Sequence, residues 1–263
     1  MPVDRATVAG GADDVDAQAA VDRARAYFER FAAEYDGAAR ESGWRLNGRL
    51  AVALSDVGPV RRAVDLACGT GETLDELARA LPGAELVGVD LAAAMVDRSA
   101  RRVPQATVVQ ADLRDFLTEA PDAWFDVLTV VGGFEFTPDL PGLLHQVRRV
   151  VAPGGHLVFT YEPVLDGWPP QSRRVETNLG SNGLELTTFR WEPDEVNSGF
   201  ADWETVRSAL LAAYQRDDVP TVYAWLEYRR PAGPCTPAPD AAPAAAAAPD
   251  SPMSGGLSSP GSS

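Results

Sequence analysis

Short apolar segments that alternate with segments of helical spacing constrain the fold more than any other feature of this sequence. The strand-like segments are RRAVDLA, AELVGVD, ATVVQAD, FDVLTVV and HLVFTYE, all between residues 61 and 162. The segments between them predict helices over Glu72–Ala80, Ala92–Arg101 and Leu140–Val151, and a short helix or turn at Leu113–Leu117. Because apolar strands separated by helices are typical of parallel sheets, the sequence predicts an α/β domain with a doubly wound sheet.

Helices are also expected on the N-terminal side of this core. Residues 16–39 carry an apolar face at three- and four-residue steps, formed by Val21, Ala24, Phe28, Phe31 and Tyr35. A second helix is expected over Trp44–Leu54. These segments would together form a helical cover over the sheet.

The chain after Pro163 is less regular. Strands are expected at Leu184–Trp191 and Thr221–Tyr228. The segment Asp202–Tyr214 favours a helix because apolar residues recur there at helical steps, and an edge strand over Thr205–Leu211 is the alternative. From about Pro231 the chain consists mostly of Pro, Ala, Gly and Ser, which predicts a disordered tail.

Composition excludes several classes of function. The formal net charge of -15 argues against nucleic acid as a partner, because binding to phosphates draws on clustered Lys and Arg. Cys68 and Cys235 are the only cysteines, so the sequence predicts no disulfide framework and no metal site. No segment is apolar enough for a signal peptide or a membrane span, and a cytoplasmic protein without a membrane partner is expected.

The turn after the first core strand is built from glycines. Gly69 and Gly71 allow positive φ angles and a close approach of a ligand to the main chain, and the helix from Glu72 offers free N–H groups. A dinucleotide site needs a third glycine where Leu74 stands, and Glu72 would repel a pyrophosphate. The Lys-Ser or Lys-Thr pair of a triphosphate site is also missing. A cationic nucleoside without phosphates, such as S-adenosylmethionine, fits better.

Several ordered motifs carry a resemblance to a known family. They are Asp65–Gly71, Asp90 within GVDLAAAMVD, Ala111–Leu113, Phe125–Val131 and Arg148–Pro163. Together they resemble the class I S-adenosylmethionine-dependent methyltransferases. The resemblance implies a Rossmann-like, mostly parallel sheet of seven strands with an N-terminal helical cover, S-adenosyl-L-methionine as the cofactor, and methyl transfer as the reaction. It does not identify the acceptor.

Asp90 is the first candidate for a cofactor contact. A carboxylate at the end of the second strand can accept hydrogen bonds from both ribose hydroxyls, and capping of the following helix is the alternative. The resemblance implies that Ala67, Gly69 and Gly71 contact the cofactor through their main chain. It also implies that Asp65 orients this loop and the amino-acid end of the cofactor.

The adenine side is expected to follow the third strand. The Asp112 carboxylate could accept from the adenine amino group while the Leu113 N–H donates to the ring, although Asp112 could simply cap a turn. Leu91 and Met95 would pack against ribose and adenine, or belong to the core. The remaining cofactor-binding candidates are Cys68, Ala111 and Val131, and for Cys68 buried packing is favoured over reactivity.

The helical cover supplies two further candidates. Tyr35 could border the transferred methyl group, with a core aromatic as the alternative. Arg45 could bind the cofactor carboxylate, with a solvated helix face as the alternative. Both assignments rest on the likeness of AEYD and SGWR to the segments that fold over the cofactor in small-molecule methyltransferases.

The catalytic residues are left unassigned by the sequence. Methyl transfer is an in-line displacement that depends mainly on alignment, so a base is optional. His145 and His156 lie at poor positions, and the segment after the fourth strand has Gly132, Gly133, Phe134 and Glu135 where related proteins have a polar residue or histidine. Weak catalytic candidates are Tyr161 and Glu162, with Glu162 as a loop cap as the alternative, and Phe134 and Trp168 are expected to contact the substrate.

These inferences predict one domain with flanking segments. The expected division is a flexible N-terminus at 1–17, a methyltransferase domain at 18–230, and a disordered tail at 231–263. Within the domain we expect a helical cover (18–58), a cofactor-binding core (61–163), an acceptor lid (164–200) and a C-terminal sheet edge (201–230). The expected acceptor is a small molecule of specialised metabolism; the alternatives are methylation of protein or RNA, or a non-catalytic cofactor-binding subunit.

Overall fold

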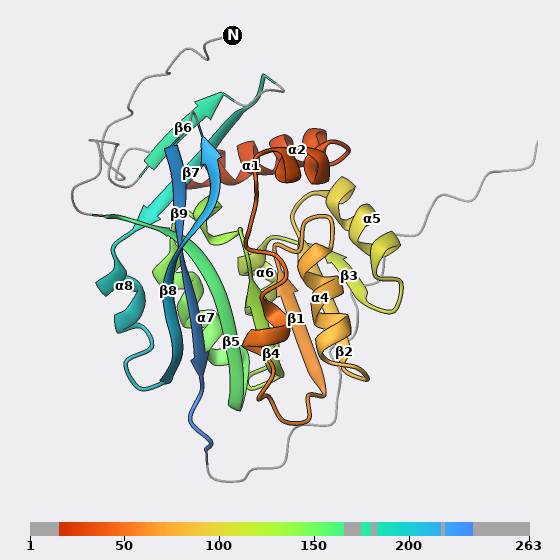
Figure 1. Ribbon diagram of the computed structural model, residues 1–263, viewed down its shortest axis with the longest axis vertical. Helices are drawn as coiled ribbons and strands as arrows, with labels where there is room; N and C mark the ends of the chain where they lie inside the picture. The colour runs from red at the N-terminus through yellow and green to blue at the C-terminus, as the bar shows by residue number, and fades with distance from the viewer. Residues whose placement is uncertain (1–15, 166–174, 180–182, 217–218, 234–263) are drawn as a thin grey trace, which may run out of the picture.

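A computed structural model describes residues 16–165, 175–179, 183–216 and 219–233 (Figure 1). Its strands in the described residues are β1 (Arg62–Leu66), β2 (Glu85–Asp90), β3 (Thr107–Gln110), β4 (Phe125–Val130), β5 (Val151–Pro163), β6 (Val175–Leu179), β7 (Glu185–Trp191), β8 (Glu204–Arg216) and β9 (Val219–Arg229). Its helices there are α1 (Ala17–Phe31), α2 (Tyr35–Glu41), α3 (Leu50–Ala53), α4 (Glu72–Ala80), α5 (Ala93–Arg102), α6 (Leu113–Glu119), the 3-10 turn η2 (Phe134–Phe136), α7 (Leu140–Val150) and α8 (Pro193–Ser198).

The strands form one doubly wound, mostly parallel sheet. Its order is β3-β2-β1-β4-β5-β7-β6, and β9 pairs with β5 on one side and with β8 on the other. The chain moves outward from β1 in both directions, because β2 pairs with one edge of β1 and β4 with the other. Ligands of such sheets bind beyond the carboxyl ends of the strands at the point where the direction reverses, which here lies between β1 and β4.

The predicted fold class is confirmed, with more strands than the resemblance implied. The described residues form a nine-stranded sheet instead of seven strands. The additional pair is β6 and β7, an antiparallel hairpin in the segment expected to be an acceptor lid. It joins the rest through two residue pairs between the end of β5 and β7, Glu162 with Arg190 and Pro163 with Trp191.

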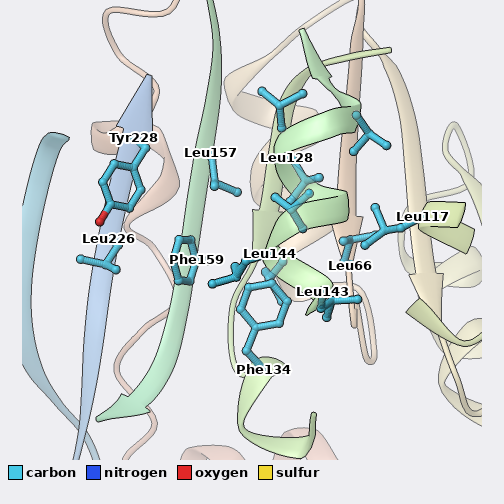
Figure 2. Close-up of a cluster of buried hydrophobic side chains, with 14 of the residues drawn as sticks. Leu66, Leu117, Leu128, Phe134, Leu143, Leu144, Leu157, Phe159, Leu226 and Tyr228 are labelled. Atoms are coloured by element: carbon cyan, nitrogen blue, oxygen red, sulfur yellow. The ribbon is translucent and has the colours of Figure 1, made fainter. Parts of the chain in front are cut away.

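Helices cover both faces of the sheet. On β1, Ala63 packs with the apolar residues of α3 and α4, whereas Val64 and Leu66 point to the opposite face, toward α6 and α7. This alternation follows from the two-residue period of a strand. Figure 2 shows the second of these clusters, in which Leu128 of β4 and Leu157 of β5 lie beside side chains of α7.

The N-terminal helices α1 and α2 lie across the carboxyl ends of the strands, at the top of Figure 1. The Asp16 carboxylate caps α1 by accepting hydrogen bonds from the main-chain N–H groups of Gln18 and Ala19. The two helices are separated by a turn, so the predicted continuous apolar face bends between Phe31 and Tyr35. The predicted N-terminal helical cover is confirmed, because both helices lie over the carboxyl ends of the strands.

The helix predicted over Trp44–Leu54 is wrong for most of its length. Only Leu50–Ala53 is helical. Gly43 and Gly48 have φ angles of 75° and 83°, which interrupt a right-handed helix on both sides of Arg45. The Gly48 N–H instead donates to the Glu76 carboxylate of α4.

The helix favoured over Asp202–Tyr214 is also wrong, and the alternative edge strand is correct but too short. From Glu204 onward this segment belongs to β8, which pairs with β9 along its whole length. The register shifts between Thr205 and Arg207 and again between Ala212 and Tyr214. Such bulges insert a residue into the two-residue alternation, so the apolar residues fall by chance at helical steps.

Two predicted segments lie almost wholly outside the described residues. These are the flexible N-terminus at 1–17 and the tail at 231–263, of which only 16–17 and 231–233 are described. Within the described part of the chain, no helix combines the length and the apolar character needed to cross a bilayer.

Candidate active site

A cavity lies between the N-terminal cover and the carboxyl ends of the strands, and its empty space of about 790 Å³ is partly open to solvent. Its wall comes from the cover (Val21, Ala24, Phe28, Tyr35), the corners after β1, β2 and β3 (Ala67, Gly69, Asp90, Leu91, Met95, Asp112, Leu113, Arg114) and the segment after β4 (Gly132, Gly133, Phe136, Thr137, Pro138, Leu143).

The glycine corner after β1 forms one edge of this cavity. Ala67, Gly69 and Gly71 have φ angles of 53°, 52° and 87°, so the chain there follows a left-handed path. A non-glycine residue in this region is uncommon, and at Ala67 it marks a backbone held by its surroundings. A Cβ on Gly71 would come within 2.7 Å of the Ser99 hydroxyl of α5. The corner therefore packs tightly on α5 while its main chain faces the cavity at Ala67 and Gly69.

Asp90 joins this corner to the end of β2. One carboxylate oxygen accepts from the Gly69 N–H at 2.8 Å and the other from the Ala92 N–H at 3.0 Å. The side chain is 8% exposed and lines the cavity. Burial raises the pKa of this carboxyl, although the N–H groups of Ala92, Gly69 and Leu91 act in the opposite direction. Because a carboxylate has about four lone-pair sites, Asp90 can still accept a hydrogen bond from a ligand.

Asp65 lies behind the corner and does not line the cavity. The Thr129 hydroxyl donates to one of its oxygens at 2.6 Å. The other oxygen is buried and has no hydrogen-bond partner among the described residues. Burial raises the pKa of Asp65 to about 8, and the nearby Asp90 and Glu76 charges add to this effect while the Thr129 hydrogen bond opposes it. An unpaired buried carboxylate oxygen is suited to a cationic group such as an ammonium.

The predicted adenine side is brought together by the structure. Leu91, Met95, Asp112 and Leu113 all line the cavity. The Asp112 carboxylate also caps α6 by accepting from the Arg114 N–H at 2.8 Å. The alternative reading of Asp112 as a cap is thus correct, and it is compatible with a position on the cavity wall.

Other predicted cofactor residues do not reach the wall. Cys68 is buried, its sulfur lies 3.6 Å from the Ser99 hydroxyl, and burial raises the pKa of its thiol, so packing accounts for it. Ala111 and Val131 pack at the edges of the apolar clusters. Among the predicted cofactor residues they are neighbours of the cavity, not lining residues.

Of the two candidates from the helical cover, only Tyr35 lines the cavity. Burial together with the charges of Glu135 and Asp90 raises the pKa of its hydroxyl. Arg45 is exposed, does not line the cavity, and donates its main-chain N–H to the Ala213 carbonyl of β8. Sequence reasoning missed Arg114, the cation that the structure places on the wall.

The substrate candidates are not gathered at the cavity. Phe134 is fully buried, with its ring centroid 5.4 Å from that of Phe159, and Figure 2 shows it inside the apolar cluster. Phe136, on the opposite side of η2, lines the cavity in its place. Tyr161 is 1% exposed and belongs to the same cluster as Phe134. Trp168 lies outside the described residues.

A buried acid cluster, defined here as Glu135, Glu162, Tyr223 and Arg190, was not predicted as a unit. The Tyr223 hydroxyl lies 2.8 Å from a Glu135 oxygen and 3.3 Å from a Glu162 oxygen. The Arg190 guanidinium pairs with the other Glu162 oxygen at 3.1 Å. The sequence signal was a lone acid between two phenylalanines after the fourth strand, but nothing local indicated that Tyr223 would reach it.

A second polar cluster, called the latch, consists of Asp36, Thr70, Arg98 and Arg102 and connects the cover to the glycine corner. The Asp36 carboxylate of α2 accepts from the Thr70 hydroxyl at 2.5 Å and from Arg102 at 2.6 Å, and Arg98 lies 3.3 Å away. Burial acts to raise the pKa of Asp36, but the hydrogen bond from Thr70 and the Arg102 charge outweigh it and lower the pKa. Because Thr70 stands between Gly69 and Gly71, the cover is tied directly to the corner.

Comparison with known proteins decides the family. Residues 63–155 match a family described as a methyltransferase domain. A demethylmenaquinone methyltransferase from Thermus thermophilus is 36% identical over 187 residues, which are 65% of this chain and 80% of that protein. The chain belongs to the class I S-adenosylmethionine-dependent methyltransferases. This confirms the resemblance, the enzyme class and S-adenosylmethionine as the cofactor.

A further relative and a solved structure are also similar to this chain. A trans-aconitate 2-methyltransferase from an Acidovorax species is 30% identical over 141 residues, or 54% of this chain and 50% of that protein. A Haloferax volcanii complex between the Trm112 activator and a methyltransferase has a TM-score of 0.60 at 18% identity, and covers 78% of this chain and 97% of that one. At this identity the likeness to that structure shows the fold alone.

The cavity fits the family cofactor on its own chemistry. The corner presents bare main chain and Asp90 keeps lone pairs for a ligand at the end of β2, while the unpaired buried oxygen of Asp65 lies behind the wall. No clustered cations face a phosphate, because Arg114 is the only Lys, Arg or His on the wall that the described residues form. These features suit a cationic nucleoside and disfavour a pyrophosphate.

Proposed function

We propose that this methyltransferase acts on a small, mostly apolar acceptor that is neutral or cationic, at carbon, oxygen or nitrogen. The observation that carries the proposal is the composition of the cavity wall. Between α1 and η2 the wall is apolar, with Val21, Phe28 and Phe136 among its residues. The rings of Phe28 and Phe136 meet edge to face with centroids 5.0 Å apart, which is an arrangement that suits a flat ring as a third partner.

The cofactor would lie along the corners of β1, β2 and β3. When bound, S-adenosylmethionine supplies a methyl group on a positively charged sulfur. Asp90 would accept hydrogen bonds from the ribose hydroxyls, and the main chain at Ala67 and Gly69 would face the amino-acid end. Leu91, Met95 and Leu113 would enclose the adenine, with Asp112 accepting from its amino group.

The charged side chains around the cavity favour some acceptors over others. The relatives include a protein named for demethylmenaquinone and one named for trans-aconitate. Asp90 and Asp112 are on the wall, and Glu135 lies behind Gly132. A tricarboxylate would face these acids with Arg114 as its single counter-charge, so we favour an uncharged ring compound over a polyanion.

The cover would align the reactants and exclude water. Methyl transfer needs the acceptor atom in line with the carbon–sulfur bond at close range, and holding two reactants this way lowers the barrier by several kcal/mol. The latch places α2 against Thr70, which closes the cavity over the glycine corner. A role in specialised metabolism remains a prediction from the sequence.

A label-transfer experiment tests this proposal. The full chain is incubated with methyl-labelled S-adenosylmethionine and one of three probes: reduced 1,4-naphthoquinone, a primary alkylamine or trans-aconitate. We expect label in the reduced naphthoquinone or the amine and none in trans-aconitate. Label in trans-aconitate alone would contradict the proposed acceptor class, and Asp90→Ala should reduce label in every probe to roughly 1–15% of wild type at a cofactor concentration near the wild-type Kd.

A further inference from the structure

We propose that Glu135 is the general base of this methyltransferase, with Tyr223, Glu162 and Arg190 as positioning residues. The inference rests on the proposed function and narrows it, because the acceptor would then carry a proton on the atom that is methylated. In the step, the acceptor atom bonds to the methyl carbon as the carbon–sulfur bond breaks and leaves its electron pair on sulfur. Glu135 receives the proton that the acceptor atom loses, and later releases it to solvent.

The position of Glu135 places its carboxyl next to the cavity wall. Glu135 lies on η2 at the carboxyl end of β4 and is 2% exposed. Gly132, three residues earlier, lines the cavity and has no side chain. A Cβ there would stand 3.8 Å from a Glu135 oxygen and 3.0 Å from the Trp44 ring. Glu135 therefore lies directly behind Gly132 of the cavity wall, and its oxygen nearest Gly132 is the one that Tyr223 contacts.

The geometry of the acid cluster favours one proton on its two carboxyls. Tyr223 has a single hydroxyl proton, yet its oxygen lies within hydrogen-bond distance of both Glu135 and Glu162, so it donates to one of them at a time. A proton on one carboxyl removes the charge repulsion between the two acids. Glu162 is paired with Arg190, which balances its charge. The proton therefore belongs on Glu135.

The surroundings of Glu135 support proton exchange near neutral pH. Burial and then the charge of Glu162 raise the pKa of Glu135 to about 8, against hydrogen bonds that lower it. The groups that face it are Glu162 from β5, Tyr223 from β9 and Tyr35 from α2, with Arg190 of β7 acting through Glu162. A pKa close to the working pH is what a general base needs.

A purely structural role explains less of what is observed. A glutamine at 135 could fasten η2 to Tyr223 equally well and would avoid repulsion from Glu162. The second Glu135 oxygen is buried and has no hydrogen-bond partner among the described residues. An unsatisfied buried carboxylate oxygen normally costs stability, so a partner from outside this chain is the more economical explanation.

The first experiment follows the proton without cofactor or acceptor. The full chain is labelled with ¹³C at the glutamate side-chain carboxyls, which leaves Asp65 silent, and the Glu135 resonance is assigned by its loss in Glu135→Gln. We expect that resonance to titrate with a midpoint near pH 8, as its raised pKa requires. A midpoint below pH 6 would overturn the proposal. Unchanged positions of the glutamate resonances from outside the acid cluster show that the variant is folded.

The second experiment measures rate against pH with reduced 1,4-naphthoquinone as the probe. A base must be ionised to accept a proton, so the wild-type kcat should rise as pH increases through about 8. Glu135→Gln should lower kcat by about 100-fold or more and flatten this rise, since base catalysis contributes roughly 10²–10⁴-fold. The Kd for S-adenosylhomocysteine should change by less than about threefold, which a lost fold would not allow.

Glu119→Gln, an exposed glutamate of α6, is the matched control and should keep the wild-type rate and pH profile. Retention of more than a tenth of kcat with an unchanged profile in Glu135→Gln would overturn the proposal. If the wild-type chain methylates none of the three probes, the proposed acceptor class fails, and the titration midpoint of Glu135 still decides whether it holds the proton.

Discussion

The two ends of the cavity are built from different kinds of chain segment. The cofactor end consists of consecutive strand-to-helix corners, where Asp90 touches Gly69 only 21 residues away. The acceptor end collects residues from distant segments, and Tyr223 meets Glu135 across 88 positions. Local corners fix the cofactor end through backbone conformation, whereas the acceptor end exists only after η2, β5, β7 and β9 have packed together.

The largest expected effect comes from a substitution that strains the backbone of the glycine corner. Gly71→Ala adds a Cβ 2.7 Å from Ser99 at a φ of 87°. Gly83→Ala is the matched control, because Gly83 has a φ of 91° but open space around it. We expect a loss of about 2–4 kcal/mol in the free energy of unfolding for Gly71→Ala against about 1–2 kcal/mol for Gly83→Ala, by urea denaturation. Equal losses would show that the packing on α5 is unimportant.

The second prediction removes the carboxylate that joins two corners. Asp90→Ala should weaken the binding of S-adenosylhomocysteine by about 1.5–3 kcal/mol, because a hydrogen bond to a charged group is worth about that much. Isothermal titration calorimetry provides the measurement. The exposed Asp97→Ala on α5 should bind like the wild type. Unchanged affinity in Asp90→Ala would mean that the ribose lies elsewhere.

The third and smallest effect concerns the latch between the cover and the corner. Because the folded state lowers the pKa of Asp36, its contribution to stability is present above the pKa of the unfolded chain and is lost as pH falls. Asp36→Asn should therefore cost about 1–2 kcal/mol in the free energy of unfolding at pH 7 and progressively less below about pH 4. Denaturation of both chains across pH tests this sign, and a constant difference would contradict it.

The same contrast explains what the sequence could and could not predict. The sheet, the helices over the core and Asp90, Asp112, Gly69 and Leu113 follow from strand ends and the residues directly after them. Arg45 is exposed and does not line the cavity, while its neighbour Trp44 packs against Gly132 of the wall, a contact that the local sequence pattern does not indicate. The role of β8 was hidden by bulges that break its alternation.

The acceptor end lay beyond sequence reasoning for a physical reason. Glu135 stands out only because Tyr223 of β9 and Glu162 of β5 lie beside it, and the sequence does not show that these strands bring them together. Phe134 and Phe136 look alike in sequence, yet one turn of η2 sends the first into the core and the second to the cavity. Long-range packing, not local pattern, decides both cases.

A crystal structure of the full chain with S-adenosylhomocysteine would show where the cofactor binds. We expect both ribose hydroxyls within hydrogen-bond distance of the Asp90 carboxylate, the adenine between Met95 and Leu113, and the sulfur at the Gly132 end of the cavity. A nucleoside bound outside this cavity, or one whose sulfur points away from Gly132 and Glu135, would contradict this expectation.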